Sequence, residues 1–160
     1  MISARPTSAP PESAPLPVAT IGFTRTTAEH FFQRLRQAGV RQVIDVRLHN
    51  GSQLAGFAKA GDLAYFLEAI AGIDYAHDPL LAPTDAMLQA YRKDRRSWPA
   101  YEQQFLALMA ERRIESRLSP ESLDGACLLC VEPAPDHCHR RLVVDYLNRH
   151  WGGRLAVHHL

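Results

Sequence analysis

The chain has 160 residues, enough for one domain with a sizeable hydrophobic core, and its formal net charge at pH 7 is +1. So small a charge excludes bulk electrostatic attraction to nucleic acid or to an anionic membrane, and any anion-binding site must be local. Three cysteines do not make a disulfide framework, and no apolar stretch approaches the roughly 18 residues that a membrane span needs. We therefore expect reduced thiols, a cytoplasmic location and no membrane partner.

The first 17 residues differ in composition from the rest of the chain. They hold five prolines among serines and alanines, without an apolar run. This composition predicts a flexible leader over 1–17, neither a signal peptide nor a strand. A single domain over 18–160 follows it.

Apolar runs and helical periodicity then alternate along the chain. A strand at 18–21 leads to a helix that Thr26 and Glu29 would open as a capping box and Gly39 would close. An apolar strand at 43–46 precedes a loop at 47–60, which we expect to be functional because unstructured loops of this length are uncommon. The remaining predicted elements are a helix between Asp62 and Gly72, a strand at 73–76, helices from Thr84 to Tyr91 and from Ser97 to Ile114, a polar turn at 118–124, a strand at 126–131, a helix to about His150 and a strand at 155–157.

This alternation of strands and helices predicts the fold class. It is typical of α/β proteins, in which crossover helices cover both faces of a parallel sheet. We expect a single α/β domain with a mostly parallel five-stranded sheet and helices on both faces. Ligands of such sheets bind in the crevice at the carboxyl ends of the strands.

Reactive side chains concentrate between the strand at 126–131 and the helix that follows it. Glu132 ends an apolar strand, where it would act as a general base or nucleophile, or brace the turn by pairing with Arg140 or Arg47. Cys138 lies at the expected helix start, where the pKa of a thiol is lowered, so it would act as a nucleophile. The alternative is that Cys138 is only a small residue packed under the turn. Cys130 is expected to belong to the core.

Other strand ends carry further candidate site residues. Asp45 is expected to reach the same crevice as Glu132 and to share acid–base work with it, unless it caps the loop that follows. His77 follows another strand and is a candidate proton shuttle. The alternative is that its ring only hydrogen-bonds to the neighbouring Asp78. Arg47 would clamp a phosphate or carboxylate, or pair with a carboxylate of the protein.

The expected anion site uses the start of the last helix. Arg140 and His139 lie in its first turn, where backbone N–H groups favour an anion. Thr24, after the first strand, would add to this site beside backbone N–H groups of the turn that Gly22 opens. A basic run at 92–96, next to Tyr91, would contact nucleic acid or form a solvated face.

The spacing of the Cys and His residues gives little support for a metal site in this chain. Cys130 and Cys138 are separated by seven residues, more than structural zinc sites favour. Cys138 and His139 are adjacent, and adjacent residues on a helix project about 100° apart. We therefore expect no metal and no cofactor.

The motifs also resemble those of a known family. The sequence resembles the DUF488 family, small α/β proteins named as a domain of unknown function, in Thr20-Ile21-Gly22, Asp45-Val46-Arg47, Tyr75-Ala76-His77, Leu128-Leu129-Cys130-Val131-Glu132 and Cys138-His139-Arg140. The family usually has His after Gly22, where this chain has Phe23, so any role of that histidine is absent here or supplied by another residue. The family usually has a Pro-x-Ser-type loop after Asp-Val-Arg, which here reads Leu48-His49-Asn50-Gly51-Ser52. The resemblance implies a fold but no settled reaction.

These residues lead to three functional hypotheses. The first is a hydrolase or group transferase acting on an anionic small molecule, nucleotide-like or a nucleic-acid component. The second is a module that binds a nucleotide or nucleic acid without chemistry. The third is a redox sensor built on Cys130 and Cys138. The sequence leaves the oligomeric state open.

Overall fold

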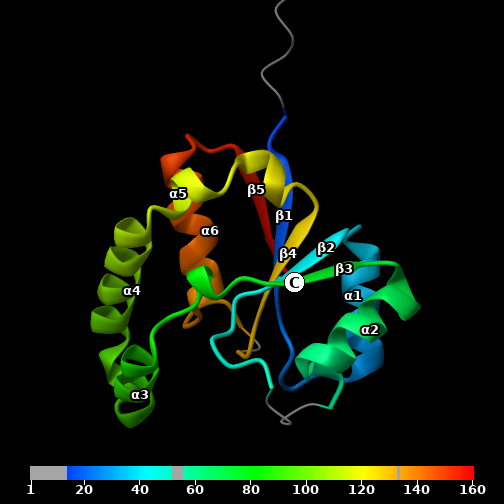
Figure 1. Cartoon of the computed structure of the whole chain (residues 1–160), viewed down its shortest axis with the longest axis horizontal. Coiled ribbons are helices and arrows are strands. Elements are labelled where there is room, and N and C mark those ends of the chain that lie inside the picture. The colour runs from blue at the N-terminus through cyan, green and yellow to red at the C-terminus, as the bar shows by residue number, and fades with distance from the viewer. Residues whose placement is uncertain (1–13, 52–55, 133) are drawn as a thin grey trace, which may run out of the picture.

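The computed structural model describes residues 14–51, 56–132 and 134–160, which form an α/β domain around one sheet (Figure 1). The strands are β1 (Leu16–Gly22), β2 (Gln42–Asp45), β3 (Asp74–His77), β4 (Ala126–Cys130) and β5 (Leu155–His159). They lie in the order β3-β2-β4-β1-β5, and each neighbouring pair is parallel. The predicted fold class is therefore confirmed.

Helices cover both faces of this sheet (Figure 1). On one face lie α1 (Ala28–Gln37) and α2 (Ala60–Ala71), and on the other lie α3 (Asp85–Lys93), α4 (Trp98–Arg112), α5 (Ile114–Arg117) and α6 (His139–His150). Single turns of 3-10 helix at Gly56–Ala58, Pro79–Leu81, Arg95–Ser97 and Pro120–Leu123 connect them. No helix in the described part of the chain has the length and apolar character that crossing a bilayer requires.

The sheet separates two hydrophobic cores. One core lies against α1 and α2 and includes Phe31 and Leu129, whereas the other lies against α4 and α6 and includes Phe105 and Leu128. Because strand side chains alternate between faces, Cys130 shares the α6 side with Leu128. This places the Cys130 side chain beside the first turn of α6.

Local signals explain most helix ends, with three differences from expectation. The helix predicted to reach Ile114 ends at Arg112, because Arg113 has left-handed backbone angles, and α5 begins after it. Thr84 caps α3 by accepting from the Met87 N–H at 3.3 Å, as predicted. At α1 the cap is Thr27, whose hydroxyl accepts from the His30 N–H, so the predicted capping box at Thr26 is wrong. Helix α2 begins at Ala60, two residues before the predicted cap.

The predicted leader falls largely outside the described residues. Residues 1–13 are not described, and Leu16 and Pro17, which we expected in the leader, belong to β1. In the predicted 47–60 loop, 52–55 are also outside the described residues. The described remainder of that loop holds the 3-10 turn at Gly56–Ala58.

Candidate active site

A cavity of about 260 Å³ opens where β2 and β4 end and α6 begins. Its walls come from four segments: the residues after β2, helix α3, the start of α4, and the turn between β4 and α6. This is the edge at which parallel sheets bind ligands. The side chains that line this cavity therefore define the candidate site.

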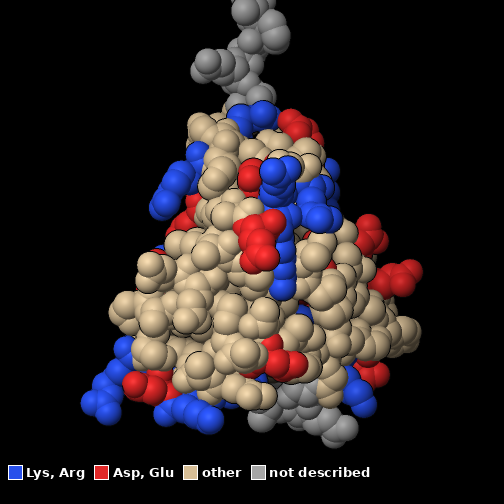
Figure 2. All heavy atoms as spheres, turned by 60° about the vertical axis from the view of Figure 1, so that its left-hand side comes forward, with Lys and Arg blue, Asp and Glu red and all other residues tan. Residues whose placement is uncertain are grey.

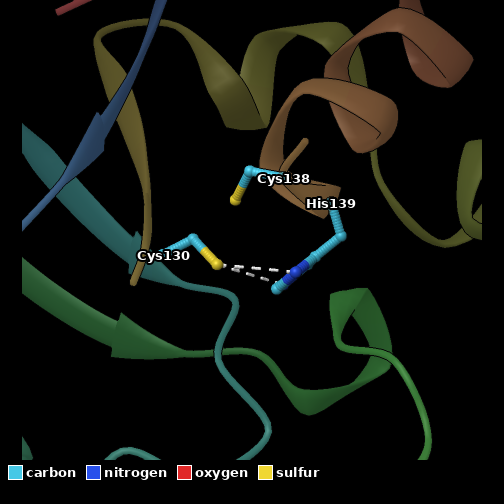
Figure 3. Close-up of side chains that lie close together, drawn as sticks. All are labelled: Cys130, Cys138 and His139. Carbon is cyan, nitrogen blue, oxygen red and sulfur yellow. Dashed lines mark hydrogen bonds between the residues drawn. The ribbon is translucent and has the colours of Figure 1, made fainter. Parts of the chain in front are cut away.

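Two thiols and an imidazole form the floor of the cavity. Their ligand-type atoms, on Cys130, Cys138 and His139, lie within 4.8 Å of one another, and all three residues are buried. Cys130 Sγ is 3.4 Å from His139 Nδ1, and the two side chains point toward each other from β4 and α6 (Figure 3). The prediction that Cys130 belongs to the core is confirmed, and the same side chain is also part of this cluster.

The tautomer of His139 follows from its second hydrogen bond. His139 Nε2 lies 2.7 Å from the carbonyl oxygen of Val46, which can only accept, so Nε2 carries the proton. In the neutral ring, Nδ1 is then the nitrogen without a proton, and it lies nearer the Cys130 sulfur, at 3.4 Å, than Nε2 does, at 3.8 Å. The carbonyl after β2 thus fixes the orientation of the imidazole.

The two thiols differ in how readily they ionise. Burial opposes ionisation of the Cys130 thiol. Hydrogen bonds from the Cys138 thiol and the backbone, together with the charge of Arg140, have the larger effect, so the pKa of the Cys130 thiol is lowered. Burial raises the pKa of the Cys138 thiol, and its hydrogen bond to Cys130 raises it further. Cys130, not the expected Cys138, is therefore the thiol that ionises first.

Glu132 also lines this cavity. Its carboxylate lies 3.5 Å from Arg95 Nη1 at the solvent-exposed side, and Arg95 also lies over the Tyr91 ring. The predicted pairing of this carboxylate with Arg140 or Arg47 is wrong. Arg140 contacts the backbone carbonyl of Glu132 and not its carboxylate, and Arg47 pairs with Asp45. The carboxylate is thus held loosely by one exposed guanidinium.

Aromatic rings form one wall of the cavity. The rings of Trp98 and His137 stack with centroids 5.0 Å apart, and Trp98 in turn stacks on Tyr101. Tyr101 is buried, which raises the pKa of its phenol, so it presents a neutral ring and hydroxyl. The sequence suggests Trp98, two residues after the basic run, only as a residue that could stack a base beside that run, and it gives no signal for Tyr101 or His137.

Asp45 lies outside this cavity. Its carboxylate receives two hydrogen bonds from the Arg47 guanidinium, at 2.8 Å each, and one from the Tyr75 hydroxyl. Arg47 also donates to the carbonyl of Ala58, which belongs to the core beside α1 and α2. Burial and the contact with Asp45 raise the pKa of Tyr75 to about 12. The expectation that Asp45 and Glu132 share one hollow is therefore wrong.

The other expected site residues contact backbone carbonyls. His77 Nε2 donates to the Arg47 carbonyl, and the Thr24 hydroxyl donates to the Val131 carbonyl, each at 2.7 Å. Arg140 is fully buried and donates to Thr20 Oγ1 and to the Glu132 carbonyl. None of these three side chains lines the cavity. They hold the strand ends that shape it.

Gly22 makes a close approach at the same place. A Cβ on Gly22 would lie 1.7 Å from the carbonyl oxygen of Glu132. Only glycine lets the end of β1 pass this close to the turn after β4. The turn that carries Glu132 is therefore fixed by β1 on one side and by Arg140 on the other.

The positive charge near the site is local. Arg92 and Arg95, from the basic run at 92–96, line the cavity together with Arg47. Figure 2 shows the side of the molecule on which α3 and α4 lie: most of its surface is uncharged, and Lys and Arg form separate groups, several of them next to Asp and Glu. This face therefore carries no continuous basic surface.

Comparison with known proteins identifies the family. The family model described as "Domain of unknown function DUF488" matches residues 27–147, which include β2, β3, β4 and nearly all of α6. No curated protein and no solved structure matches the chain. Because the match spans well over half of the sequence, the chain belongs to the DUF488 family.

Proposed function

We propose that this protein is an enzyme, a hydrolase or group transferase, that acts on an anionic small molecule in the cavity between β4, α4 and α6. The observation that carries this proposal is that a carboxylate, a thiol–imidazole cluster and several guanidinium groups line the same cavity. Convergent polar groups in a concave site beside an apolar wall are typical of catalytic pockets.

The substrate class follows from the lining. Arg92 and Arg95 would attract a phosphate or carboxylate, and the start of α6 adds the positive end of a helix dipole. The stacked wall of Trp98 and His137 suits a planar ring system. A nucleotide-like molecule or a nucleic-acid component combines both properties.

Glu132 is the acid–base group of this proposal. Its carboxylate lines the cavity at the end of β4, where its only described ionic partner is Arg95 at 3.5 Å. A bound anion would compete for that guanidinium and leave the carboxylate to accept a proton from the attacking group and return it to the leaving group. Asp45 and His77 take positioning roles, because both hold Arg47 in place.

A screen of nucleotides, nucleosides and sugar phosphates tests the proposal. With a substrate found, Glu132→Gln is expected to lower kcat by about 10²- to 10⁴-fold, and Arg95→Ala is expected to raise KM. Glu121→Gln, which removes a carboxylate paired with Arg154 on the surface, is the matched control and keeps full activity. Activity that survives Glu132→Gln unchanged would reject the assigned role.

Two other outcomes separate the remaining hypotheses. Ligand binding without turnover would identify a binding module, and salt-dependent retention on RNA or DNA that is lost when the basic residues of 92–96 are replaced would make that module a nucleic-acid binder. Loss of two free thiols after mild peroxide treatment would favour the redox sensor, for which the proximity of Cys130 and Cys138 is the supporting observation. The free thiols of this site also fit a reducing, cytoplasmic location.

A further inference from the structure

We propose that Cys130, Cys138 and His139 bind a divalent zinc-class metal ion, with its fourth coordination position open to the cavity. The role of this ion in catalysis rests on the proposed function, but its binding does not. Two thiolates and one imidazole are ligands that zinc prefers, and three protein ligands with one open position are typical of catalytic zinc sites.

The donor atoms already have nearly the required spacing. A tetrahedral zinc ion with two sulfur ligands and one nitrogen ligand holds those atoms roughly 3.5–3.8 Å apart. Cys130 Sγ and His139 Nδ1 are 3.4 Å apart, and the Cys138 sulfur lies within 4.8 Å of the Cys130 sulfur and of a ring nitrogen of His139. Rotations of the side chains, without a change of fold, would complete the site.

The protonation state of the imidazole suits a metal ligand. The Val46 carbonyl holds the proton on His139 Nε2, which leaves Nδ1, the ring nitrogen nearer Cys130 Sγ, free to bind a metal ion. Ligating histidines usually donate their other N–H to a carbonyl or carboxylate in this way, which fixes the ring and strengthens it as a ligand. This second contact is independent of the thiols, and it points to the same site.

The backbone explains how two adjacent residues can share one ion. Adjacent helical residues diverge, which was the reason to expect no metal here. Cys138, however, is the residue before α6 and has extended backbone angles, φ −138° and ψ 137°, whereas His139 is the first helical residue. Their side chains therefore do not follow helical spacing, and Figure 3 shows that they approach the same space beside Cys130.

The surroundings of the cluster favour an open site. In the described part of the chain, the metal-ligand group contains these three residues and no fourth Cys, His, Asp or Glu. All three line the cavity together with Glu132. A metal ion there would bind water or a substrate oxygen in its fourth position and lower the pKa of a bound water. Glu132, two residues beyond Cys130, would then accept the proton.

Metal binding can be measured without any substrate. The full chain, purified under reducing conditions and freed of metal, is titrated with Zn²⁺ and separately with Co²⁺. We expect about one ion per chain, protection of Cys130 and Cys138 from alkylation, and, with Co²⁺, a thiolate charge-transfer band and the visible bands of tetrahedral cobalt. No uptake by the reduced wild-type chain, or cobalt spectra without thiolate bands, would overturn the proposal.

Variants locate the site. Cys130→Ser, Cys138→Ser and His139→Gln are each expected to weaken zinc binding by more than about 100-fold. Cys127→Ala is the matched control, because Cys127 is a buried β4 cysteine on the opposite face of the sheet. Full binding by all three variants would place the metal elsewhere and overturn the assignment; the wild-type cobalt spectrum decides the question if a variant does not fold.

The two proposals fail in different ways. Glu132→Gln is expected to keep the metal and lose turnover. If the chain turns over a substrate equally well after all metal has been removed, the ion has no catalytic role, but the proposed function still holds. A chain that binds the ion tightly but turns over none of the compounds screened would overturn the proposed function and leave the metal site standing.

Discussion

Replacing Gly22 by alanine tests the close contact that fixes the turn after β4, which carries Glu132. The added Cβ would lie 1.7 Å from the Glu132 carbonyl oxygen and 3.1 Å from Arg140 Nη1, whereas ordinary contact begins at 3.4 Å. The obstructing atom is backbone, so it cannot rotate away. The end of β1 and the turn after β4 must therefore separate by at least about 1.7 Å.

The cost has two parts. Overpacking in a close-packed interior costs about 1–3 kcal/mol. Moving the Glu132 carbonyl also breaks its hydrogen bond from the buried Arg140 guanidinium, and a hydrogen bond to a charged group contributes about 1.5–3 kcal/mol. We expect Gly22→Ala to lower the free energy of unfolding by about 3–5 kcal/mol and Tm by roughly 10 °C.

Urea unfolding of the variant and the wild-type chain measures this loss. Gly61→Ala is the matched control, because Gly61 lies in α2 with nothing within 4 Å of the place that an added methyl group would take, and alanine favours a helix by about 0.5–1 kcal/mol. Stability of Gly22→Ala within about 1 kcal/mol of the wild type, or a loss equal in both variants, would refute the reasoning.

Three further predictions concern other contacts. Asp45→Asn leaves a buried guanidinium without its carboxylate and is expected to cost about 3–5 kcal/mol in urea unfolding; a loss below about 1 kcal/mol would contradict a buried ion pair there. Thr27→Ala is expected to cost about 1 kcal/mol and Thr26→Ala almost nothing, because only Thr27 caps α1; equal losses would contradict this assignment. The hydrogen bond from Tyr146 holds the pKa of Glu115 below 4.5, so this contact stabilises the fold above that pH and is lost as the pH falls through the lowered pKa. In Tyr146→Phe, an NMR titration should show the Glu115 pKa rising, and an unchanged value would show that the hydrogen bond has no effect.

Much of the fold was predictable because its signals are local. Apolar runs marked four of the five strands, all except β3, whose sequence Asp-Tyr-Ala-His is mostly polar, and the alternation with helices gave the parallel sheet. The cap at Thr84 lies just before a clear apolar period and was predicted correctly. At Thr26 and Thr27, two equivalent side chains are adjacent, and only the backbone path decides which of them caps the helix.

The site was harder to predict because it depends on which face of the sheet carries the cavity. Asp45 and Cys130 both end buried strands, so position along the chain treats them alike. Strand alternation turns Cys130 toward α6 and Asp45 toward Ala58, but only the packing of α3 and α4 decides which face is hollow. The pairing of Glu132 with Arg95 depends on the same packing, because Arg95 comes from the segment between these helices.

The position of β1 has a consequence for how the molecule assembles. It lies between β4 and β5, so the strand synthesised first pairs only with the two synthesised last. Until the segment 126–159 has left the ribosome, β1 has no neighbour on either edge, and β2 and β3 pair alone. Such contacts between distant parts of the chain slow folding and leave an apolar strand exposed to aggregation while translation continues.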